Sequence, residues 1–228
     1  MEQINNMKQT SRYDEVSPRR RGSNLLIILL FFALILQGCK DDDKLDMDNP
    51  TPDTFNGTVT AKVENGASYE AEISTVWALY DATTNSAGQL NGRMLATGDY
   101  TNGGFTINMT EIPASFLMNV QTFFATVLNV SGELDIDEPD ARMLSADFFG
   151  IASDNTTYVD FFTYSSTGSK RTTCLFIYVD SNVTIKDGKS ISVAFQKGWN
   201  RMYVTPSDRM AVSKAPKDLK WYLNKDLK

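Results

Sequence analysis

The sequence predicts an all-β fold of the sandwich type, and three of its features support this. Short runs rich in β-branched and aromatic residues recur from position 57 to the end of the chain. Turn residues such as Asn65-Gly66, Asn102-Gly103 and Asp187-Gly188 separate these runs. Only residues 114–127 show the spacing of a helix. Many short strands with frequent turns are typical of sandwiches and barrels.

The first half of the predicted fold, residues 55–130, opens with an amphipathic strand. Its apolar residues Val59, Ala61 and Val63 alternate with polar ones, which is the pattern of a strand with one buried face. Three more apolar runs follow, and the last two are placed to form a hairpin. The four strands are expected at 57–63, 73–80, 93–100 and 105–109.

Residues 114–127 are the one candidate for a helix. Apolar side chains recur there at spacings of three and four, after a proline near the helix start: Phe116, Leu117, Val120, Phe124 and Val127. A strand that begins at Thr122 is the alternative, because the run after it is also β-prone. We therefore expect at most one short helix near 114–127.

The second half of the predicted fold, residues 131–228, returns to strands after an acidic loop at 133–140. Its strands are expected at 143–149, 158–164, 174–179, 183–185, 191–195 and 199–204, and Trp221-Tyr222 is expected in a last strand that docks on the body. This second β half is expected to pack against the first. The two halves form either two β domains or one continuous domain.

Residues 1–38 have the layout of a signal peptide. Arg19, Arg20 and Arg21 precede twelve apolar residues at 25–36, a run too short to span a bilayer comfortably. The run ends in Leu36-Gln37-Gly38-Cys39, which resembles the lipobox of bacterial lipoproteins, although Gln37 departs from the usual small or β-branched residue. The resemblance implies cleavage before Cys39 and attachment of lipid to its sulfur. An uncleaved signal anchor is the alternative.

Residues 39–54 are expected to be an acidic, flexible tether. Lys40, Asp41, Asp42 and Asp43 resemble the export signal beside the lipid-bearing cysteine of surface-exposed lipoproteins in Bacteroidetes. The resemblance implies an outer-membrane lipoprotein that is exposed on the cell surface. A solvated, charged spacer is the alternative interpretation of the same run. In either case its carboxylates repel an anionic headgroup layer, so the folded part stands off the membrane.

Composition excludes several classes of function. Of 22 basic and 28 acidic residues, five and three lie before Cys39, so the mature chain has a net charge of −8. Such a charge opposes nucleic-acid binding and suits a soluble monomer. The absence of histidine excludes Ser-His-Asp and Cys-His catalysis and imidazole metal sites. If Cys39 carries lipid, Cys174 has no intramolecular disulfide partner and is expected to be a buried, inert thiol.

Several segments together resemble a group of secreted Bacteroidetes lipoproteins of unknown function. These segments are Thr97–Met109, Phe176–Gly188, Lys197–Asn200 and Leu219–Tyr222, and the resemblance covers about residues 57–223. It implies a β-sandwich whose first half is immunoglobulin- or prealbumin-like. It carries no catalytic residue.

Two groups of side chains are candidates for ligand binding. Aromatic side chains that could stack on sugar rings are Trp199, Tyr203, Trp221 and Tyr222, although packing in the core is the commoner role of such residues and is favoured for Trp199. The acidic loop offers carboxylates at Asp135, Asp137, Glu138 and Asp140. It lacks the glycine and the distant glutamate of an EF-hand, so we expect a solvated loop and no metal site.

These observations predict a lipid-anchored, non-enzymatic binding module of the cell envelope that uses no cofactor. Its ligand is expected to be a glycan or another envelope protein. A structural or assembly component of a surface complex is the alternative. A carboxylate-based glycoside hydrolase is the third hypothesis, and it requires two carboxylates about 5–10 Å apart in a cleft.

Overall fold

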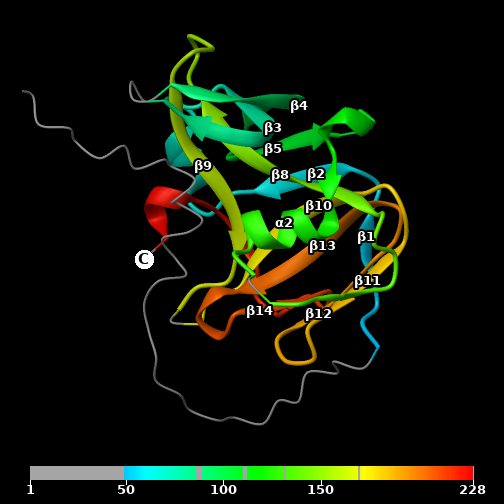
Figure 1. Cartoon of the computed structure of the whole chain (residues 1–228). Coiled ribbons are helices and arrows are strands. Elements are labelled where there is room, and N and C mark those ends of the chain that lie inside the picture. The colour runs from blue at the N-terminus through cyan, green and yellow to red at the C-terminus, as the bar shows by residue number, and fades with distance from the viewer. Residues whose placement is uncertain (1–48, 86–88, 110–111, 131, 169, 228) are drawn as a thin grey trace, which may run out of the picture.

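The computed structural model describes residues 49–85, 89–109, 112–130, 132–168 and 170–227. Their strands form one 15-stranded sheet system, and they contain a single α-helix (Figure 1). The predicted all-β, sandwich-like fold is therefore confirmed. None of the helices in these ranges is both long and apolar enough to cross a membrane, and the apolar run at 25–36 lies outside them.

In the described residues, four short 3-10 turns interrupt the succession of strands. The strands before residue 130 are β1 (Asp53–Phe55), β2 (Thr58–Lys62), β3 (Thr75–Thr84), β4 (Leu90–Thr101), β5 (Gly104–Asn108) and β6 (Met118–Asn119). Those after it are β7 (Asp135–Ile136), β8 (Arg142–Ile151), β9 (Tyr158–Ser165), β10 (Thr173–Val179), β11 (Val183–Lys186), β12 (Ile191–Phe195), β13 (Gly198–Thr205), β14 (Met210–Val212) and β15 (Lys220–Leu223). The 3-10 turns are Gly66–Tyr69, Ala114–Phe116, Pro206–Asp208 and Asn224–Asp226.

The two predicted halves share one sheet. The strand order is β2-β5-β4-β3-β8-β9-β10-β13-β14-β12-β11-β7, with β1 paired to β13, β15 to β9 and β6 to β8. The halves join where β3 runs antiparallel to β8, from Thr75 opposite Ile151 to Leu79 opposite Asp147.

The sheet closes on itself at its N-terminal end. β1 pairs with β13, and the chain then passes through Gly57 into β2, which pairs with β5. The indole nitrogen of Trp199 in β13 donates to the carbonyl of Met109 after β5, at 2.7 Å. A parallel bridge between Val63 and Trp221 joins β2 to β15. These contacts enclose a first core of apolar side chains, which includes Phe105, Phe148, Phe162, Phe176, Trp199 and Trp221.

The helix α2 (Val120–Val127) covers a second core on the other face of the C-terminal strands (Figure 1). Phe123 and Phe124 of α2 are fully buried in this core together with Ile177 of β10 and Met202 of β13. The helix α2 therefore covers the second core, whereas the curled sheet itself encloses the first core.

The predicted helix is present but starts later than expected. The side-chain oxygen of Asn119 accepts a hydrogen bond from the backbone N–H of Gln121 at 2.8 Å and so caps α2. The residues before it form a 3-10 turn and the short strand β6, which pairs Met118 with Met143. The alternative strand from Thr122 does not form.

The expected end of the tether is wrong, and four short strands were not expected. Asp53 and Thr54, which were expected in the flexible tether, belong to β1 and pair with Arg201 and Asn200. The strands β1, β6, β7 and β14 were not predicted at all. Each has only two or three residues, which is too short for an alternating pattern to be recognised.

Candidate functional site

The predicted lipid attachment residue Cys39 and the predicted export signal, Lys40 to Asp43, lie outside the described residues. Their roles stay predictions. The described chain begins at Asn49, next to the groove described below.

The aromatic residues predicted to bind a ligand do not form an exposed platform. Trp199, Tyr203 and Trp221 are buried, and only Tyr222 is half-buried. The Trp221 ring stacks on Phe176 at 5.5 Å and meets Phe105 edge-on at 5.3 Å. Closure of the sheet accounts for this burial, because β15 brings Trp221 into the first core. Three of the four candidates therefore pack in the core in place of facing solvent.

The Tyr203 hydroxyl has a structural partner that the sequence did not suggest. It donates to the carboxylate of Asp53, which also forms an ion pair with Arg201 at 3.0 Å. Burial and this hydrogen bond raise the pKa of Tyr203 far above its usual value. The three side chains hold β1 against β13. Asp53 stood in an acidic, proline-containing stretch, and no local pattern distinguished it from its neighbours.

The acidic loop is held in place by hydrogen bonds. A carboxylate oxygen of Asp137 accepts from the backbone N–H of Thr184 at 2.7 Å. The carbonyl of Pro139 accepts from the side-chain amide of Asn119 at 2.9 Å, so the loop is tied to the start of α2. Glu138 and Asp140 are exposed. Within the residues that the structure describes, no group of three or more metal-ligating side chains forms a metal site, and the expectation of no metal remains a prediction.

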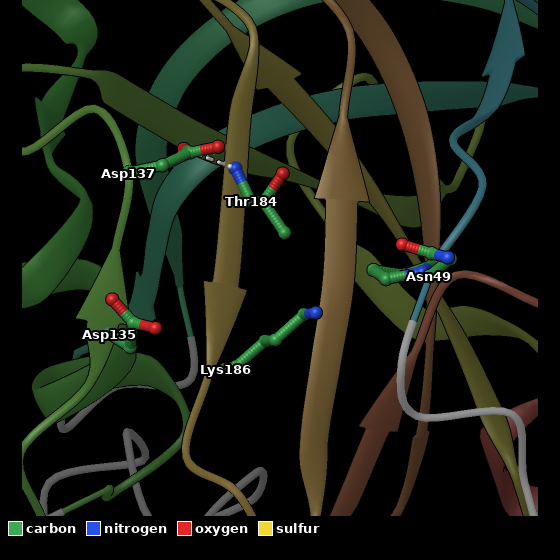
Figure 2. Close-up of a pocket in the computed structure, with 6 residues that line it drawn as sticks. Asn49, Asp135, Asp137, Thr184 and Lys186 are labelled. Carbon is green, nitrogen blue, oxygen red and sulfur yellow. Dashed lines mark hydrogen bonds between the residues drawn. The ribbon is translucent and has the colours of Figure 1, made fainter.

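A polar groove lies where this loop meets the edge of the sheet. Its volume is about 330 Å³, and its lining residues are Asn49, Pro50, Asp135, Asp137, Thr184 and Lys186. β11 forms its floor: Val183 and Ile185 point into the second core, so Thr184 and Lys186 face the other way. Figure 2 shows the Lys186 side chain reaching from β11 towards Asn49, with β12 between them, and Asp135 and Asp137 on the other side of β11.

The lining of the groove offers several hydrogen-bonding atoms and more polar than apolar surface. Asp135 and Asp137 accept, Lys186 donates, and Thr184 and Asn49 can do both. Pro50 is the one apolar residue in the lining. Such a surface suits a ligand with several hydroxyl or amide groups, bound without covalent chemistry.

A second hollow lies beside the loop that follows α2. Its volume is about 370 Å³, and its lining combines apolar residues with Asp187, Ser190 and Arg209. The Asp187 carboxylate accepts from the backbone N–H groups of Lys189, Ser190 and Ile191. Burial opposes its ionisation, but these hydrogen bonds outweigh burial and lower its pKa. Asp187 therefore orders the turn between β11 and β12.

Burial changes the ionisation of two further side chains, Cys174 and Asp147. Burial raises the pKa of the Cys174 thiol far above its usual value, and this thiol is buried and free. The predicted burial of Cys174 is confirmed, and its lack of reactivity stays a prediction. Burial also raises the pKa of Asp147 in β8 to about 6. Asp147 was not singled out from the sequence, although its charge within the largely apolar run of β8 is a visible signal.

Comparison with known proteins gives no match: no protein-family model, no curated protein and no solved structure is significantly similar to this chain.

Proposed function

We propose that this protein is a non-enzymatic binding module of the cell envelope, anchored to the outer membrane by lipid on Cys39 and displayed on the cell surface. Its ligand is a polar molecule, with a glycan as the first choice, held in the groove between Asn49 and β7. The protein acts as a monomer and uses no cofactor.

The groove is the observation that supports this proposal best. Three separate segments contribute to it: the start of the described chain, β7 with the loop after it, and β11. Its polar lining presents donors and acceptors together, which is what a polyhydroxylated ligand requires. Because Asn49 lies within the predicted tether, residues 39–54, a ligand bound there lies beside the start of the folded domain.

No catalytic role is part of the proposal. The two carboxylates of the groove differ in their surroundings, since Asp137 binds the Thr184 N–H while Asp135 is exposed in β7. A carboxylate-based glycoside hydrolase remains the third candidate. Release of reducing sugar from a bound glycan would establish it.

A thermal-shift panel of polysaccharides with the mature protein in detergent tests the proposal. A glycan at one hundred times its Kd adds about 2.7 kcal/mol to the free energy of unfolding, which is a measurable rise in Tm. The rise should disappear in Asp135→Asn and Lys186→Met, because both remove groups that line the groove. Asp140→Asn and Lys189→Met change the same charges outside the groove and should keep it. A rise that persists in all four variants would contradict binding in the groove.

The alternative, a component of a surface protein complex, is favoured by a different observation. The face of β3, β4, β8 and β9 that points away from the first core carries half-buried Trp77 and Phe161, and Met94 on this face is 43% exposed. An apolar face of this kind is typical of a protein interface.

A further inference from the structure

Asp147 lies in the middle of an apolar sheet face. In β8 the neighbouring residues Ala146 and Phe148 point into the first core, so the Asp147 side chain points to the opposite face, with Phe149. Register places Leu79 of β3 directly across from Asp147, and Met94 of β4 across from Leu79. We define the outer face as Asp147 and the apolar side chains around it: Trp77, Leu79, Met94, Phe149 and Phe161. Leu79 and Phe149 are buried, so exposed Met94 and half-buried Trp77 and Phe161 supply its accessible apolar surface.

The Asp147 carboxylate makes no hydrogen bond and no ion pair with any residue that the structure describes. Burial alone accounts for its raised pKa. Other titratable residues of the surrounding strands are engaged elsewhere or exposed; they are Tyr80, Asp81, Arg93, Asp99, Tyr100, Arg142, Tyr158, Asp160, Tyr164, Cys174 and Tyr178. The Asp147 oxygens are not among the buried, unpaired side-chain atoms of the described residues, so they reach the surface and are open to a cation from outside.

The backbone around Asp147 is also unusual. β8 pairs with β10 up to Ala146 and with β9 from Phe148 onwards, so its neighbour on that side changes at Asp147. Asp147 is therefore the residue at which the sheet branches, and it is paired with no residue of β9 or β10.

We propose that the outer face is a docking surface for a partner protein that presents a lysine or arginine, whose cationic group pairs with the Asp147 carboxylate. Charge complementarity selects the occupant, because the Asp147 carboxylate lies among apolar side chains and register places a second carboxylate, Asp99 of β4, on the same face opposite Thr75. The alkyl stem of lysine or arginine packs well on such a surface. The Trp77 and Phe161 rings offer it further cation–π contacts. This site is separate from the polar groove and does not depend on glycan binding.

The chemistry is tested with side-chain analogues and the isotope-labelled mature protein. At pH 7.5, n-butylguanidinium and n-butylammonium should bind saturably and shift the amide NMR signals of β3 and β8, while n-butanol should not. Binding should weaken at least tenfold in Asp147→Asn and survive in Asp147→Glu. Asp140→Asn, an exposed carboxylate of the acidic loop, is the matched control and should bind as the wild type does. Equal shifts with n-butanol, or unchanged binding in Asp147→Asn, would overturn the proposal.

The affinity for the cation should rise with pH. A carboxyl with a pKa of about 6 is roughly one-tenth ionised at pH 5 and fully ionised at pH 7.5, so the wild-type affinity should increase about tenfold between them. Asp147→Asn should show no such increase. An affinity that is flat with pH in the wild type would exclude Asp147 as the cation's partner.

A peptide distinguishes a protein partner from a free organic cation. N-acetyl-Leu-Arg-Leu-amide carries the guanidinium group within an apolar surface. It should bind at least tenfold more tightly than n-butylguanidinium, because its leucines contact the apolar side chains of the outer face. Equal affinities would assign the face to small cations and overturn the partner-protein proposal.

Discussion

At the scale of single residues, two aspartates show how opposite surroundings change the same side chain. Asp154 lies exposed in the turn before β9, where it accepts hydrogen bonds from the side chain and backbone of Thr157 and from the backbone of Thr156. These bonds lower the pKa of Asp154 to about 2. Asp147 has no such donors, and burial raises its pKa to about 6. Hydrogen bonding in one case and burial in the other set the direction of the pKa shift.

Asp147 should make the protein less stable as the pH rises from 4 to 7. The unfolded chain loses this proton near pH 4, while the folded state keeps it until about pH 6. Ionisation therefore favours the unfolded state across this interval, by about 3 kcal/mol. Asp147→Asn should remove this contribution and be the more stable protein at pH 7. Urea unfolding of both proteins at pH 4, 5, 6 and 7 measures the difference. A constant difference across the series would show that Asp147 titrates normally.

Trp221 shows which residue roles a sequence cannot reveal. Its neighbours are lysine-rich and polar, so the sequence permitted an exposed, sugar-binding role. Its burial depends on β15 pairing with β9, more than 50 positions earlier in the chain, and on the bridge to Val63. Trp199, in contrast, stands within a strand that could be recognised locally, and its predicted place in the core is confirmed.

At the scale of elements, α2 depends on the residue that precedes it. Asn119 caps the helix through its side-chain oxygen and ties it to the acidic loop through its amide nitrogen. Asn119→Ala should therefore lower the free energy of unfolding by about 1–2 kcal/mol. Gln121→Ala is a control on the exposed side of the same helix and should change it little. Chemical denaturation measures both, and an equal loss in the two variants would show that the cap is unimportant.

The longer elements could be predicted because their patterns are local. β2, β8, β10 and β13 each contain an alternating or continuous apolar run, and all four were expected near their observed positions. The strand β7 could not be found in this way. It consists of Asp135 and Ile136 and forms only because β11 lies beside it. The polar groove depends on this strand, so it could not be predicted either.

At the scale of the whole molecule, the sequence predicted the fold class but not the closure of the sheet. Closure brings together β1, β2, β5, β13 and β15, which are distant along the chain. No periodic pattern encodes such pairings. The acidic loop was predicted as a set of carboxylates, whereas its position beside Lys186 depends on the finished sheet.

Lipid on Cys39 should decide where the whole molecule resides. Cys39→Ala should abolish labelling with an alkynyl fatty acid and move the protein from the membrane fraction to the soluble fraction, because its stable anchoring depends on the attached acyl chains. Cys174→Ala is the matched control and should keep both the label and the membrane location. Labelling that persists in Cys39→Ala would contradict lipidation at this residue.

The pairing of β1 with β13 also determines how the protein would carry mechanical load. If lipid on Cys39 anchors the protein, drag on the domain pulls on the chain before Asp53, so tension enters the fold at β1. The ion pair of Asp53 with Arg201 and the hydrogen bond from Tyr203 take this force first. They pass it to β13, which is hydrogen-bonded along its length to β10 inside the sheet. The load is thus spread over a central strand, and the groove beside Asn49 lies next to the point where force enters.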